Sequence, residues 1–89
     1  MVYLVTYDLN KQGKNYDALY SCLREYKYIR DVDLDSVWFL STTWSADQID
    51  ADIRQYMDGN DRLFVTRLHQ GEHQGWMNPK IWEWINSNL

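Results

Sequence analysis

The chain begins with an apolar segment, residues 2–9, that has the character of a strand. Val2, Leu4 and Thr6 form one of its alternating faces, and Tyr3, Val5, Tyr7 and Leu9 form the other. Because both faces are largely apolar, the pattern predicts a central strand that is covered on both sides. Asp8, the one acid of the segment, comes where the strand ends, and a polar loop follows at residues 10–14.

Two stretches have the spacing of amphipathic helices. The first is residues 15–26, with Asn15 positioned to cap it and Tyr16, Leu19, Tyr20, Leu23 and Tyr26 on its apolar face. The second begins at Ser45, because Ser45 and Gln48 have the spacing of a capping box. Its apolar face carries Ile49, Ile53, Tyr56 and Met57, and Gly59 is expected to be the C-cap glycine that ends it.

Three further strands follow from the pattern. Residues 28–34 alternate loosely, and their charges indicate an edge strand. Asp35 and Ser36 form a candidate tight turn, which joins this strand to the apolar residues 37–42 in a hairpin. Residues 62–68 form the fourth strand.

The C-terminal part is predicted to be a helix, at about residues 78–88. Asn78 is its N-cap and Pro79 its first helical residue. The shared face of this helix contains Ile81, Trp82, Ile85 and Leu89, with Trp84 at its margin, so we expect it to pack on the sheet.

The order of elements predicts an α+β fold. Two strand–helix units around a hairpin give a ferredoxin-like βαββαβ arrangement, a four-stranded antiparallel sheet with two helices on one face. The last helix is an addition to this arrangement, and residues 1–89 make a single domain.

Composition limits the classes of partner. The formal net charge is −4 and the nine Lys and Arg residues are scattered, which disfavours nucleic acid as a partner. Five Trp and seven Tyr are many for a domain of this size, so some rings are expected at an interface. The single cysteine, Cys22, excludes an intrachain disulfide and is expected to fill a small space in the core. We expect a cytoplasmic protein, because the sequence shows neither a signal peptide nor a membrane-spanning apolar run.

Two short motifs resemble a known family. Residues 4–9 (Leu-Val-Thr-Tyr-Asp-Leu) and 36–39 (Ser-Val-Trp-Phe) resemble the first strand and the central hairpin of the CRISPR-associated Cas-two family, over roughly residues 1–68. The chain looks closest to small stand-alone relatives called SinR-like, and more distantly resembles the virulence-associated protein D toxins. It departs from the family in its mildly basic loop at residues 10–14 and in the Trp-rich C-terminal helix, where many members have an extra strand that subunits exchange.

The resemblance implies a homodimer in which Asp8 of each subunit approaches its mate. In nuclease members of that family the matching pair of Asp residues holds a divalent metal, and Mg²⁺ suits such a site. Asn10 and Ser36 are then candidates to hydrogen-bond around Asp8. The alternative is that Asp8 caps the loop or the next helix, and that Asn10 and Ser36 are ordinary turn residues.

Other clusters have two interpretations each. His69, Glu72 and His73 are zinc-ligand types, but Gly71 between them favours a solvated loop. Trp38, Trp82 and Trp84, together with Trp44 and Trp76, are candidates to stack on bases or to anchor a protein partner, and core or dimer packing is the simpler interpretation. The acidic residues Asp31, Asp33, Asp35, Asp47, Asp50 and Asp52 form either a negative face for a basic partner or a solubilising surface.

The sequence therefore favours a dimeric binding and assembly module, in a defence, anti-defence or toxin–antitoxin context. The alternative is a metal-dependent endonuclease that acts on RNA or DNA through paired Asp8 carboxylates. The sequence has no glycine-rich phosphate loop, no Ser-His-Asp set and no paired cysteine motif.

Overall fold

The computed structural model describes residues 1–11 and 15–89, so part of the predicted loop at 10–14 lies outside the described residues. Four strands form one antiparallel sheet in the order β2-β3-β1-β4: β1 (Val2–Asp8), β2 (Lys27–Ile29), β3 (Val37–Ser41) and β4 (Arg62–Leu68). β1 lies in the interior of the sheet, where Val5 faces Trp38 of β3 on one side and Val65 of β4 on the other. The prediction of a ferredoxin-like α+β fold with a central first strand is confirmed.

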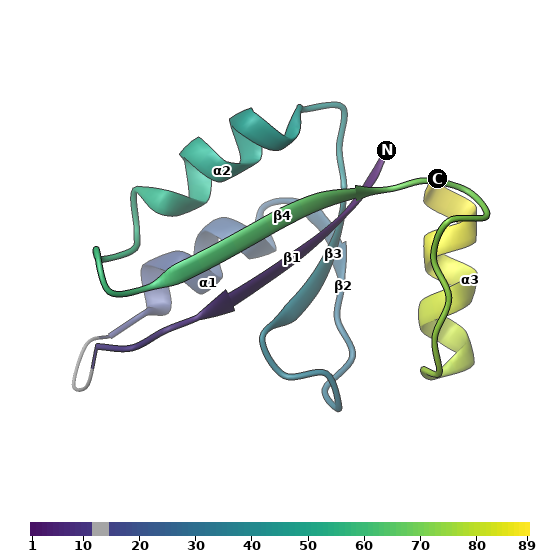
Figure 1. Ribbon diagram of the computed structural model, residues 1–89, viewed down its shortest axis with the longest axis horizontal. Coiled ribbons are helices and arrows are strands. Elements are labelled where there is room, and N and C mark those ends of the chain that lie inside the picture. Colours follow the sequence, from purple (N-terminus) through teal and green to yellow (C-terminus); the bar gives the residue numbers. More distant parts are fainter. Residues whose placement is uncertain (12–14) are drawn as a thin grey trace.

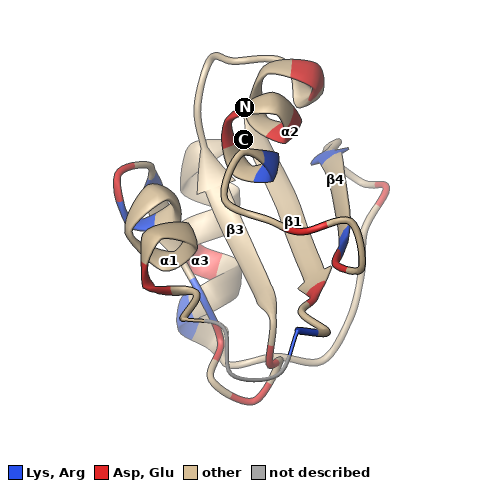
Figure 2. Ribbon diagram, turned by 90° about the vertical axis from the view of Figure 1, so that its left-hand side faces the viewer, with Lys and Arg blue, Asp and Glu red and all other residues tan. Residues whose placement is uncertain are grey.

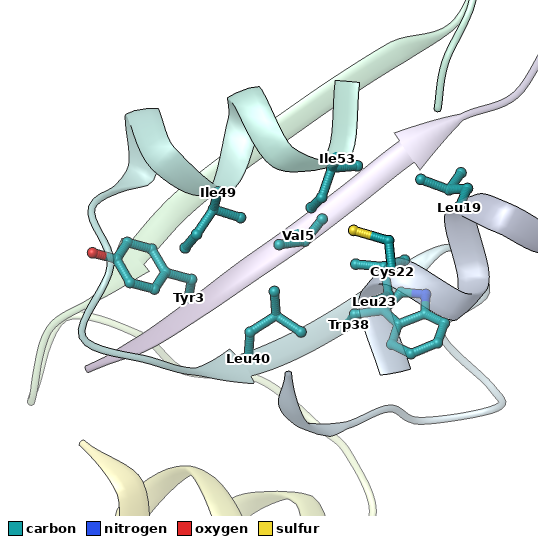
Figure 3. Close-up of a cluster of buried hydrophobic side chains, with 9 residues drawn as sticks. All are labelled: Tyr3, Val5, Leu19, Cys22, Leu23, Trp38, Leu40, Ile49 and Ile53. Atoms are coloured by element: carbon teal, nitrogen blue, oxygen red, sulfur yellow. The ribbon is translucent and has the colours of Figure 1, made fainter. Parts of the chain in front are cut away.

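Two helices cover one face of this sheet (Figure 1): α1 (Asp17–Arg24) and α2 (Ala46–Arg54). Alternate residues of β1 and β3 point into the layer between the helices and the sheet, as the period of two in a strand requires. The buried side chains of this core are Tyr3, Val5, Leu19, Cys22, Leu23, Trp38, Leu40, Ile49 and Ile53 (Figure 3).

The third helix, α3 (Pro79–Asn88), packs on the opposite face of the sheet (Figure 1). Its Ile81 and Ile85 are buried against Val2 of β1 and Phe39 of β3. Trp82 and Trp84 are half-buried at the edge of this second core, whereas Leu89 stays exposed. No helix in residues 1–11 and 15–89 is both long and apolar enough to cross a membrane.

One part of this second face lies outside the core that α3 forms with Val2 and Phe39. We call it the open face: Thr6 and Asp8 of β1 with Arg62, Phe64 and Thr66 of β4. Phe64 is 61% exposed on the edge strand β4, where its register partner is Thr6 of β1. The open face therefore presents one large apolar ring among polar side chains.

The predicted caps agree with the structure at two of three helices. Ser45 and Gln48 form the capping box of α2, and the Asn78 side chain accepts the amide N–H of Lys80 at the start of α3. At α1, however, Tyr16 occupies the N-cap position, and Asn15 Oδ1 instead accepts the amide N–H of Asp17 at 2.8 Å. Asn15 therefore bonds to the first turn from one residue farther out than predicted.

The hairpin between β2 and β3 differs from the prediction. The strand predicted at 28–34 ends at Ile29, because Asp31 Oδ1 accepts the N–H of Asp33 and the Asp31 carbonyl accepts the N–H of Leu34, which turns the chain. The connection is thus a long loop, 30–36, and not a tight turn at Asp35 and Ser36. Ser36 ends this loop with a left-handed φ of 62°.

The predicted C-cap glycine of α2 is wrong. The helix ends at Arg54, and the C-cap residue is Gln55 in a right-handed helical conformation. Gly59 lies four residues farther on, in the turn before β4, and it does not have a positive φ. A C-cap residue in the right-handed conformation does not have to be glycine, so the helix ends without the left-handed glycine that the prediction expected.

Candidate functional site

Asp8 lies at the rim of a polar cavity where β1 ends. This strand-end cavity has a volume of about 350 Å³ and is lined by Tyr7, Asp8, Leu9, Tyr20, Arg30, Asp35 and Ser36. The lining residues come from β1, α1 and the hairpin loop, segments far apart in the sequence. Sequence reasoning predicted Asp8 and Ser36 here, but it missed Tyr7, Tyr20, Arg30 and Asp35 as neighbours.

Arg30 forms the positive side of the strand-end cavity. Its guanidinium carbon lies 4.5 Å from the centre of the Trp38 ring, and a terminal nitrogen lies 3.9 Å from Asp35 Oδ1. Trp38 in turn donates its indole N–H to the Tyr7 hydroxyl at 3.0 Å. Burial raises the pKa of Tyr7, so this phenol stays neutral, and its oxygen accepts the hydrogen bond from the indole N–H.

Ser36 and Asn10 act differently from each other. The Ser36 hydroxyl lies 3.5 Å from the Thr6 hydroxyl, and the backbone N–H of Ser36 donates to Asp35 Oδ1. These contacts hold Ser36 in the cavity that Asp8 also lines. Asn10 turns away from Asp8. Its amide N–H donates to Asp61 Oδ1 at 2.9 Å and its side chain donates to the carbonyl of Asn60, so that Asn10 anchors the loop after β1 to the loop before β4.

The donor set of the strand-end cavity is small for a metal. Within residues 1–11 and 15–89, no three His, Cys, Asp or Glu side chains are grouped so that they could hold a metal ion. Mg²⁺ is often bound by one or two carboxylates while it keeps several waters. Asp8 and Asp35 line one cavity and meet that minimum, although Asp35 also pairs with Arg30.

The five tryptophans occupy different environments. Trp38 is fully buried, so its side chain has no exposed surface for a partner, and it packs in the core as the simpler interpretation expected. Trp82 and Trp84 are half-buried on α3, and Trp44 is 44% exposed with its ring edge against Tyr26. Trp76 is 100% exposed in the segment before α3.

The histidine cluster does not converge on a common point. A ring nitrogen of His73, Nδ1, lies 2.9 Å from the carbonyl oxygen of His69, so it carries the proton of that hydrogen bond. The His73 ring stacks on Trp82 with centroids 6.0 Å apart. These contacts hold the segment 69–78 against α3. They agree with the interpretation of this segment as a loop and not as a zinc site.

Cys22 belongs to a link between α1 and α2. Asp52 Oδ2 accepts from the Tyr26 hydroxyl at 2.5 Å and lies 3.5 Å from the Cys22 sulfur. Burial, and then the Asp52 carboxylate, raise the pKa of Cys22 to about 12 and also raise the pKa of Tyr26. A thiol with this pKa is not a nucleophile at neutral pH, which agrees with a core residue.

Comparisons with family models, curated proteins and solved structures gave no match to this chain. Function is therefore inferred from the geometry of the two surfaces described above, the strand-end cavity and the open face.

Proposed function

We propose that the chain is a Cas-two-like homodimeric binding and assembly module, and that the open face is its dimer interface. Phe64 carries this proposal, since its ring is 61% exposed on the part of the sheet face that lies outside the α3 core. Two copies that pack through this face remove both rings from water. Burial of apolar area is the main source of stability in protein association.

The charges of the open face support self-association. Asp8 and Arg62 are register partners on neighbouring strands, at the same end of the face. A two-fold dimer forms each contact twice, so the Asp8 of each copy can meet the Arg62 of the other. Figure 2 shows Lys and Arg residues distributed over several elements, among Asp and Glu residues.

The proposal predicts that Phe64→Glu weakens the dimer by roughly tenfold or more, because it replaces the apolar ring of each copy by a carboxylate that must lose water in the interface. Gln70→Glu is the matched control, since it adds the same charge at an exposed position outside the open face. Sedimentation equilibrium over a range of protein concentrations measures both variants. A wild-type protein that stays monomeric at high concentration contradicts the proposal.

The second candidate function is a metal-dependent endonuclease. The observation that favours it is the position of Asp8, which is exposed at the strand end on the same face as Phe64. A dimer through this face brings two such carboxylates toward each other, and a pair can bind Mg²⁺. The surrounding composition, with a net charge of −4, opposes the approach of a polyanion.

A cleavage assay separates the two functions. We expect no metal-dependent cleavage of single- or double-stranded RNA or DNA with Mg²⁺ or Mn²⁺, and Asp8→Asn to behave as wild type. The control is Asp47→Asn, an exposed acid on α2 that lies outside the strand-end cavity. Cleavage that needs metal and Asp8 but not Asp47 makes the nuclease function primary.

A further inference from the structure

A second surface lies beside the open face, between α3 and the sheet. A cavity of about 290 Å³ has sheet residues as its floor and residues 73–77 and α3 as its walls. Another, of about 540 Å³, lies between the hairpin loop and the start of α3. The two cavities share Leu34, Trp76 and Met77, so they form one continuous depression, which we call the α3 groove.

The floor and walls of the α3 groove are apolar and aromatic. The side chains that give it this character are Leu4, Leu34, Phe39, Leu68, Trp76, Met77, Trp82 and Ile85. Trp76 is 100% exposed at the junction of the two cavities, and nearby Val32 is 84% exposed. Large apolar side chains gathered around a depression mark a binding surface.

One end of the α3 groove is acidic. Asp31 and Asp33 line it, and Asp35 follows in the same loop, so acids alternate with Val32 and Leu34. Asp31 is 8% exposed and its side chain accepts the N–H of Asp33, whereas the Asp33 side chain itself is exposed. The nearby cations are Arg30, which lies over Trp38 and pairs with Asp35, and Lys80 in the first turn of α3.

We propose that the α3 groove binds a basic, apolar segment of a partner protein. Apolar side chains of the segment fill the space around Trp76 and Met77, and a Lys or Arg side chain meets the exposed Asp33. Charge complementarity selects this occupant, since an amphipathic cationic helix in an apolar groove with an acidic rim is a recurring mode of recognition. The inference rests on the proposed binding function, for which it names the class of partner.

The same charges argue against two other occupants. Nucleic acid is repelled by the acids at the rim, because its binding depends on Lys and Arg contacts to phosphate. A second copy of the chain is proposed to pack on the open face, and it offers this groove no cluster of cations, since its nine Lys and Arg residues are scattered along the sequence. The experiment below treats both as outcomes that overturn the proposal.

The test uses the full chain and a fluorescein-labelled synthetic peptide of leucine and lysine with helical spacing. We expect saturable binding by fluorescence anisotropy, and no binding of the matched peptide of leucine and glutamate. Trp76→Ala is expected to weaken binding by roughly tenfold, and Asp33→Asn by roughly threefold. Both substituted side chains are exposed, so the variants keep the fold.

Asp47→Asn is the control for general attraction of a cationic peptide, because Asp47 lies on α2 across the sheet from the groove. Equal loss in this variant, or unchanged binding by Trp76→Ala, overturns the proposal. Self-association that Trp76→Ala abolishes assigns the groove to a second copy, and preference for an oligonucleotide assigns it to nucleic acid. The dimer is scored separately with Phe64→Glu, so a monomer that binds the peptide refutes only the proposed dimer, and a dimer that ignores it refutes only the groove.

Discussion

Replacement of Trp38 by alanine is expected to lower the free energy of unfolding by about 3–5 kcal/mol. Trp38 is the largest fully buried side chain, and it lies between β3 and the α1 layer (Figure 3). Its removal leaves a cavity in a closely packed core, deprives the Tyr7 hydroxyl of a donor and removes the ring under Arg30. Urea denaturation followed by far-ultraviolet circular dichroism measures the change.

Trp76→Ala is the matched control for this prediction. It removes the same side chain from a position that is 100% exposed, so the free energy of unfolding should change by less than about 0.5 kcal/mol. If Trp38→Ala destabilises the protein no more than Trp76→Ala does, then Trp38 does not pack as the structure has it. The interpretation of Trp38 as a binding residue then becomes the better one.

The strand pattern was the most informative part of the sequence. Residues 2–9 alternate apolar side chains on both faces, and the structure places β1 between two strands with a core on each side. The starts of α2 at Ser45 and of α3 at Asn78 and Pro79 were also predicted, because helix caps depend on residues that are close together in the sequence. Local patterns therefore predicted the elements and their order.

The face that α3 covers was not predicted. Amphipathic spacing shows that a helix has a buried side, but it does not show which surface buries that side. The deciding residues lie elsewhere in the chain: Val2 and Phe39 point away from α1 and α2, and they need a cover of their own. An apolar second face on β1 and β3 was the available signal for the position of α3.

The candidate site was predictable only at its strand end. Asp8 follows a recognisable strand, but Arg30, Tyr20 and Asp35 reach the same cavity from other elements. The position of Arg30 depends on stacking over Trp38 and on the loop that Asp31 turns, neither of which has a sequence pattern. Contacts between distant segments decide the site, and a single sequence contains little information about them.

The second large effect is expected at Asp61, where alanine should lower the free energy of unfolding by about 2–4 kcal/mol. Asp61 is 7% exposed, and its carboxylate accepts hydrogen bonds at 2.8–2.9 Å from the amide N–H groups of Asn10 and Asp58 and from the Tyr16 hydroxyl. These bonds join the loop after β1, the start of α1 and the turn before β4. Alanine leaves two partly buried amide hydrogen bonds without this acceptor, and that loss is the main cost.

Asp61→Asn tests the cause. Asparagine keeps one carbonyl oxygen and replaces the other by an NH₂ group, so it can retain the bonds to Oδ1 from Asn10 and Tyr16 but not the bond to Oδ2 from Asp58. We therefore expect Asp61→Asn to have a free energy of unfolding between that of the wild type and that of Asp61→Ala. Asp33→Ala, at an exposed acid, should change stability by less than about 0.5 kcal/mol in the same urea experiment. Equal effects of Asp33→Ala and Asp61→Ala would show that the Asp61 hydrogen bonds do not hold these three segments together, and that the loop beside Asp8 is fixed by other contacts.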